Sequence, residues 1–126
     1  MFMILYNVTV AIEKSVEEDW KVWMRDIHIP EVMTTGAFVE HKFFRVMKEE
    51  EESSSYSIQY FAEDHSKLQA YLGQHAPRLQ KKAGDAFPGK FAAFRTLLQE
   101  VWYSWICLYS NLQLIHASSK SAPNFL

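Results

Sequence analysis

Apolar side chains recur at every second position in residues 3–12, 56–62 and 90–101, which is the period of a β-strand with one buried face. In the first stretch the even-numbered face is apolar without a break, and the odd-numbered face is mixed. In the last stretch Arg95 shares a face with apolar side chains, while Phe94 lies on the other face. These stretches predict three strands.

Residues 37–62 predict a β-hairpin, which supplies a further strand at 37–47. Both arms are rich in Phe, Val and Tyr, residue types that favour strands. Between them lies KEEEESSS, whose like charges and serines favour a solvent-exposed loop over a metal site, because flexible carboxylates lack fixed geometry. Both faces of residues 38–47 carry large apolar groups, so we expect something to cover each face.

A spacing of three and four between apolar residues predicts a helix after the first strand. Ser15 and Glu18 form the pattern of a capping box, which would begin this helix. Its predicted buried stripe consists of Val16, Trp20, Trp23, Met24 and Ile27. Pro30 disfavours helical geometry at Ile29, so we expect the helix to kink or end there.

A second helix follows the hairpin, with Asp64 or Ser66 as its N-cap. Its predicted stripe consists of Leu68, Tyr71, Leu72, His75, Ala76, Leu79 and Ala83. Pro77 interrupts this pattern. We expect either a kink or a new helix that has Pro77 in its first turn, where the missing N–H costs nothing.

The resulting order, β-α-β-β-α-β, predicts an α+β ferredoxin-like sandwich, an antiparallel sheet with both helices on one face. The other face would carry Asn7, Thr9 and aromatic groups, and is too apolar to remain in water. We therefore expect a homodimer of the dimeric α/β-barrel type, packed sheet to sheet around a pocket. Residues 1–101 form the predicted domain, and residues 102–126, nearly devoid of charge, a C-terminal extension.

Composition excludes several functional classes. The net charge is −2 with no basic stripe, so no nucleic-acid partner is predicted. The single Cys107 excludes an internal disulfide and indicates a reducing, cytoplasmic location. No apolar run reaches the about 18 residues that span a membrane, and the N-terminus is interpreted as a strand rather than a signal peptide. The chain has no phosphate-binding glycine loop, paired-cysteine metal motif or nucleophile elbow, so no cofactor or metal is predicted.

Six polar residues among apolar neighbours are candidates for lining a ligand pocket: Asn7, His28, Arg45, Tyr60, His75 and Arg95. His28 precedes the expected helix end, where a cation is favoured by the helix dipole. The functional alternative is a polar group at the pocket mouth beside Glu31. His75 lies on the second stripe and shares a face with Arg78, either as a satisfied, partly buried histidine or as a ligand or general base.

The two arginines lie mid-strand, and a buried guanidinium needs a partner. One interpretation pairs Arg45 and Arg95 with Glu40 or Glu63, or with the second chain of a dimer. The other is a carboxylate-binding fork in the pocket, for which the planar guanidinium is suited.

Five segments closely resemble DUF4286, a small bacterial family of unknown function: MILYNVTV (3–10), WMRDIHIPEVM (23–33), YSIQYFA (56–62), YLGQHAPRLQ (71–80) and KFAAFRTLL (90–98). The resemblance covers about residues 1–101 and stops at the extension. The family is similar to dimeric α/β-barrel proteins such as the antibiotic-biosynthesis monooxygenases, which implies the same fold and no established reaction. Haem-degrading members of that wider group use an Asn on the first strand, a Trp on the third and a His on the second helix. Asn7 and His75 stand in similar places, but Tyr60 and Phe61 stand where a Trp is needed, so haem degradation is not implied.

Three functional hypotheses follow, and they leave open whether the protein is an enzyme. The first is a protein that binds a small apolar or aromatic ligand, in a pocket between helices and sheet or at the dimer interface. The second is a cofactor-independent monooxygenase acting on an aromatic or polyketide-like substrate. The third is a protein-interaction module that uses its edge strand or C-terminal extension. A closed pocket with convergent polar groups would favour the first two.

Overall fold

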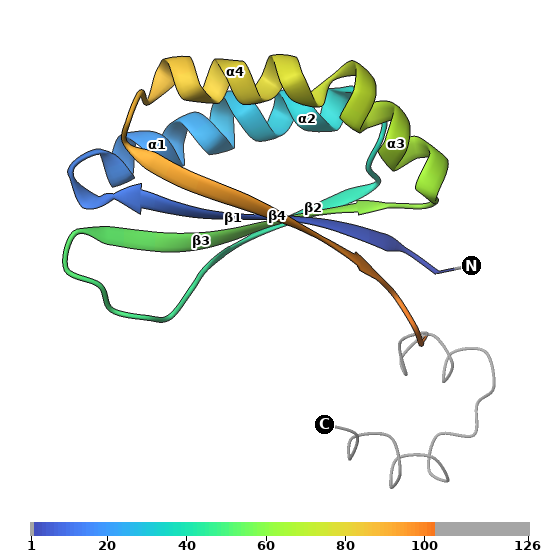
Figure 1. Ribbon diagram of the computed structural model, residues 1–126, viewed down its shortest axis with the longest axis horizontal. Helices are drawn as coiled ribbons and strands as arrows, with labels where there is room; N and C mark the ends of the chain where they lie inside the picture. Colours follow the sequence, from blue (N-terminus) through green and yellow to red (C-terminus); the bar gives the residue numbers. More distant parts are fainter. Residues whose placement is uncertain (1, 103–126) are drawn as a thin grey trace, which may run out of the picture.

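A computed structural model describes residues 2–102 as a four-stranded antiparallel sheet with helices on one face (Figure 1). The strands lie in the order β2-β3-β1-β4, so β1 is central and pairs with both β3 and β4. Their bounds are β1 Ile4–Glu13, β2 Glu40–Arg45, β3 Ser53–Ala62 and β4 Phe91–Gln99. This is the predicted α+β ferredoxin-like sandwich.

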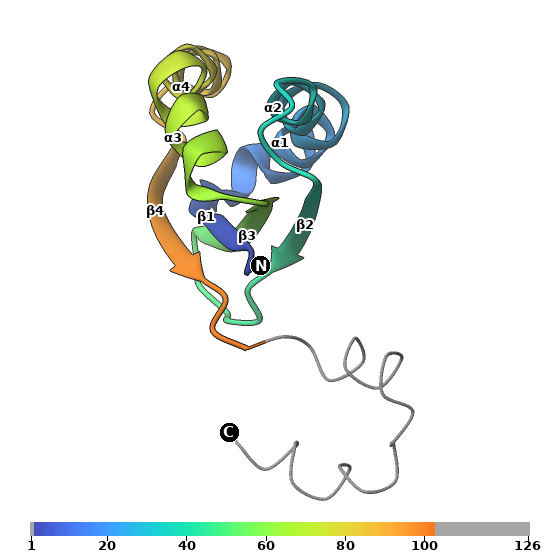
Figure 2. The ribbon, with the colours of Figure 1, turned by 90° about the vertical axis from the view of Figure 1, so that its right-hand side faces the viewer.

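Two helical segments lie side by side on the same face of the sheet (Figure 2). The first joins η1 Lys14–Val16, α1 Glu17–Trp23, η2 Met24–His28 and α2 Ile29–Thr34. The second joins α3 His65–Gln74 and α4 Ala76–Ala86. No helix within residues 2–102 is both long enough and apolar enough to cross a membrane.

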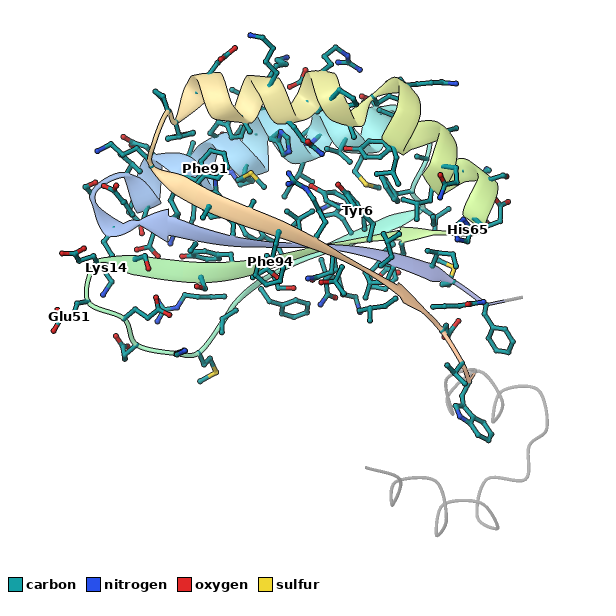
Figure 3. The ribbon with its side chains drawn as sticks, in the orientation of Figure 1. Tyr6, Lys14, Glu51, His65, Phe91 and Phe94 are labelled. Carbon is teal, nitrogen blue, oxygen red and sulfur yellow. The ribbon has the colours of Figure 1, made fainter. Side chains whose placement is uncertain are left out.

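The core fills the space between the sheet and these helices. Because Tyr6 pairs with Tyr60 and Leu97, the even-numbered side chains of β1 share a face with their partners on both neighbours. Figure 3 shows Tyr6 and Phe91 on the helical side of the sheet and Phe94 on the opposite side. The fully buried aliphatic side chains are Ile12, Val32, Ile58, Leu68 and Leu79. Each contributes about 1.5–3 kcal/mol by its removal from water.

The hairpin differs from the prediction in its first strand, which spans Glu40–Arg45 rather than residues 37–47, and at its acidic end. β3 begins at Ser53, so the three serines assigned to the loop belong to the strand. They pair with the last residues of β1, from Ala11 to Glu13, and these backbone hydrogen bonds outweigh the low strand propensity of serine. Glu51 remains exposed in the connection, as expected for a solvated loop.

The capping box was a wrong prediction. Ser15 lies in η1, where its hydroxyl donates to Glu13 Oε1 at 3.3 Å, and no side chain caps α1. Glu17 instead accepts hydrogen bonds from the hydroxyls of Tyr56 and Ser54 on β3, the latter at 3.0 Å. These bonds lower the pKa of Glu17, while burial is the largest cause that raises the pKa of Tyr56 to about 12. The start of the helix is therefore fixed from the sheet rather than from within the helix.

Pro30 does not end the first helical segment. A π-helical turn, η2, precedes it, and the Ile29 N–H bonds to the Met24 carbonyl five residues back. The proline consequently lies in the first turn of α2, where its missing N–H is tolerated. The turn inserts one residue into the helical repeat, so Ile27 is 46% exposed while Ile29 takes the buried position. The predicted burial of Ile27 was wrong for this reason.

The second helical segment follows the prediction. The Asp64 carboxylate accepts a hydrogen bond from the Lys67 N–H at 2.9 Å and caps α3. A separate helix, α4, then begins at Ala76 with Pro77 in its first turn. The break lets the chain turn while Leu68 and Leu79 both stay in the core.

Deleting Ile27 is expected to convert η2 into a regular α-helical turn, since Met24 and Ile29 would then be four residues apart. We expect the free energy of unfolding to fall by less than about 2 kcal/mol, measured by urea denaturation followed by circular dichroism. Deleting the exposed Lys81 is the control. Because α4 is a regular α-helix without an inserted residue, this deletion would rotate its buried side chains away from the core. That deletion should cost at least about 3 kcal/mol. Equal losses would contradict this account of η2.

Candidate functional site

A cavity of about 50 Å³ lies between the sheet and the two helical segments. Most of its wall is apolar, formed by Val8, Val10, Trp20, Met24, Ile58 and Leu79 among others. Its exposed lining residues are Gln80 on α4 and Arg95 on β4, so its mouth lies between these two elements. The cavity therefore has a buried inner end over β1 and β3 and a wet end beside β4.

Three tyrosines line the inner end. Tyr6, Tyr60 and Tyr71 are 4%, 2% and 4% exposed, and the Tyr6 ring lies 6.1 Å from Tyr60 and 5.8 Å from Tyr71. Burial raises the pKa of Tyr60 and of Tyr71, so both phenols are protonated at neutral pH. None of the three hydroxyls makes a hydrogen bond with residues 2–102. They are therefore free to bind a molecule inside the cavity.

His28 lines the cavity from the last position of η2. Its ring stacks on Trp23 with centroids 5.0 Å apart and an interplanar angle of 21°. Its Nδ1 is buried and has no hydrogen-bond partner in the described chain. Desolvation lowers the pKa of His28 to about 4, and nearby Arg95 also lowers it. The imidazole is thus neutral at neutral pH, and its predicted role as a cation at a helix end was wrong, because the helix continues into α2.

An ion pair joins the two helical segments near the cavity. Lys82 on α4 donates to Glu31 Oε2 on α2, while Glu31 Oε1 is buried without a partner in the described residues. This carboxylate also favours protonation of His28, but less strongly than desolvation opposes it. Glu31 itself does not line the cavity, so its charge is offset by Lys82 rather than presented to a ligand.

Arg95 faces the cavity because it pairs with Val8 on the helical side of the sheet. It is exposed, and it makes neither an ion pair nor a hydrogen bond with residues 2–102. The predicted partners form ion pairs with other residues. The Glu40 carboxylate lies 3.9 Å from Lys42 Nζ, and the Glu63 carboxylate lies 3.7 Å from Lys67 Nζ. The intramolecular ion-pair prediction is therefore wrong for Arg95.

Arg45 is likewise exposed and makes no ion pair within the described residues. It lies on the far edge strand β2, opposite Tyr56, and does not line the cavity. Its guanidinium acts at longer range, where it helps to lower the pKa of Glu17. Arg45 is thus separate from the group that surrounds the cavity.

Asn7 and His75 also lie elsewhere. Asn7 is on the open face of the sheet, where it accepts a hydrogen bond from Ser57 at 2.6 Å and donates to Thr9 at 3.0 Å. His75 lies between α3 and α4, with its Nδ1 3.0 Å from Arg78 Nη2, outside the cavity lining. The pair that suggested a haem-like site is therefore split between the two sides of the sheet.

The cavity brings together three of the six predicted site residues, His28, Tyr60 and Arg95. Tyr6 and Tyr71 were missed, because each lies on an apolar stripe and was assigned to the core. Their phenol groups were the available signal, since a buried Tyr hydroxyl usually finds a partner. No Asp or Glu lines the cavity, and residues 2–102 contain no group of three side chains able to hold a metal ion.

Solved structures similar to this one share its fold at low sequence identity. The cofactor-independent oxygenase SnoaB from Streptomyces nogalater is 16% identical, with a TM-score of 0.58 over 83% of this chain and 98% of the oxygenase. An EthD family protein from Bacillus halodurans is 16% identical, with a TM-score of 0.55 over 82% of this chain and 100% of that protein.

A dimeric ferredoxin-like protein from an uncultured marine organism is 10% identical, with a TM-score of 0.55 over 82% of this chain and 100% of that protein. No curated protein matches the sequence. The model of a domain of unknown function, DUF4286, matches residues 3–101, and the chain therefore belongs to the DUF4286 family.

Proposed function

We propose that this protein binds a small organic molecule in the cavity between the sheet and the helices. The observation that carries the proposal is the set of hydrogen-bonding side chains that line an otherwise apolar cavity without partners of their own. The phenols of Tyr6, Tyr60 and Tyr71 and the guanidinium of Arg95 all belong to this set. His28 belongs to it as well, because its Nδ1 is buried and has no hydrogen-bond partner in residues 2–102. Leaving such a buried group unsatisfied costs about 1–3 kcal/mol, which a bound molecule would recover.

The cavity volume limits the size of that molecule. An apolar cavity of about 150 Å³ accommodates benzene, whereas the cavity here is about 50 Å³. A polyketide-like ring system would require the helical segments to move apart. This argument favours binding of a small molecule over the alternative of a cofactor-independent monooxygenase, which rests on structural similarity to SnoaB. Oxygen consumption with a phenolic substrate would support that alternative.

We also propose that the protein is a cytoplasmic homodimer whose subunits pack through the open face of the sheet. This face exposes Phe44, Phe94 and Leu98 on the two edge strands, around the polar groups of Asn7 and Ser57. Large apolar side chains that gather on one exposed face favour contact with another protein surface. Residues 1–101 would then form the dimerising domain, and residues 102–126 an extension of it.

Replacing Phe94, which is 63% exposed on the open face, is expected to disrupt the dimer. We expect light scattering at micromolar concentration to give a dimer mass for the native chain and a monomer mass for Phe94→Glu, because the new charge would be desolvated at the interface. The control is Val22→Glu, which places the same charge at a 48% exposed position on α1. A native monomer would contradict the proposed assembly.

Filling the cavity is expected to remove ligand binding. Native mass spectrometry of the purified protein should show extra mass on the native chain and none on Ala93→Leu, because the larger side chain would occupy the space beside Arg95. Ala92→Leu is the control, since Ala92 lies on the same strand and faces the other side of the sheet. Equal occupancy of both variants would place the bound molecule outside the cavity.

The depressed pKa of His28 predicts a loss of stability in mild acid. Below about pH 6.5 the unfolded chain binds a proton that the folded chain excludes until about pH 4, so the free energy of unfolding should fall as the pH is lowered through this window. His28→Gln should reduce this slope, as measured by urea denaturation between those pH values. Comparing the two proteins cancels the contributions of carboxylates such as Glu17 and Asp64. Identical slopes would show that His28 is solvated.

A further inference from the structure

The charge on the residues that line the cavity is positive. Among residues 2–102, Arg95 is the only charged residue that lines it, and no carboxylate of this part of the chain shares the wall. Glu31 is the carboxylate whose charge acts on His28, and it accepts a hydrogen bond from Lys82. The wet end of the cavity therefore presents an uncompensated positive charge among neutral groups, which favours an anionic ligand.

The guanidinium of Arg95 has the geometry to bind a carboxylate group of a ligand. It has five N–H donors in a planar fork, and none of them is used by residues 2–102. Gln80 lines the same end from α4 and supplies a further amide. A carboxylate at the mouth would accept charge-assisted hydrogen bonds there without being fully removed from water.

The inner end sets different requirements. Its walls are aliphatic and aromatic, and its polar groups are the hydroxyls of Tyr6, Tyr60 and Tyr71. His28 also lines the cavity, and its buried Nδ1 has no partner in residues 2–102. A phenol O–H can donate to a keto or hydroxyl oxygen, and it cannot compensate a second full charge. The enclosed volume of about 50 Å³ has room for about two groups the size of a water molecule. The part of the ligand that enters is thus short and carries one neutral oxygen.

We infer that the cavity binds a short-chain carboxylate with a keto or hydroxyl oxygen at its far end, its carboxylate against Arg95 and that oxygen among the tyrosine hydroxyls. The inference rests on the proposed function and narrows its ligand from any small organic molecule to an aliphatic oxo or hydroxy acid. An aromatic acid would place a ring where the enclosed space holds only a short chain.

The test compares 3-hydroxypropanoate with its neutral amide, 3-hydroxypropanamide, by calorimetric titration of the full-length protein. The two probes have the same shape and the same hydroxyl group, so only the charge at the mouth differs. We expect the acid to bind at least about tenfold more tightly, as charge-assisted hydrogen bonds imply. Arg95→Gln should abolish this difference, and Arg95→Lys, which keeps the charge without the fork, should retain part of it.

Arg45→Gln is the matched control, because Arg45 is also an exposed mid-strand arginine without an ion pair in the described chain, but lies away from the cavity. It should leave both affinities unchanged. Equal binding of acid and amide would overturn the inference while the proposed function stands. An equal loss in Arg45→Gln and Arg95→Gln would also overturn it, because the effect would reflect net charge. Binding of neither probe, with no co-purified mass on the native chain, would remove the proposed function as well.

Discussion

The pairing of β1 with both of its neighbours determines which side chains meet the helices. Since side chains alternate across a strand, a slip of one residue would exchange the core for the open face. The observed register puts Tyr6 and Val8 beneath the helices and Asn7 on the opposite side. The cavity, the open face and the position of Arg95 all depend on this register.

Much of this arrangement could be predicted from the sequence, because alternation is a strong local signal. The unbroken apolar face of residues 3–12 predicted the buried side of β1. A new helix with Pro77 in its first turn was one of the two alternatives expected there, and α4 is that helix. The π-helical turn was missed because Pro30 was expected to kink the helix or to end it, and an inserted residue was not considered. The buried residues Met24 and Ile29 are five apart, and that interval was the available signal.

The candidate site was only partly predictable, because it depends on long-range geometry. The alternation of side chains along β4 put Arg95 on the same face as apolar residues. Only its pairing with Val8 in the structure shows that this face borders a cavity. Tyr6 and Tyr71 satisfied the core pattern by their rings, so their hydroxyls were overlooked. Asn7 and His75 were linked by analogy with other proteins, and the sheet separates them.

The ion pair between Glu31 and Lys82 connects α2 to α4, and these helices enclose the cavity from above. Both side chains are partly exposed, and pairs of this kind contribute about 0–1 kcal/mol and are screened by salt. The two helical segments are therefore held together on this side by a weak contact. Raising the ionic strength would weaken this contact, so the separation of the two helical segments on this side would depend on the salt concentration around the protein.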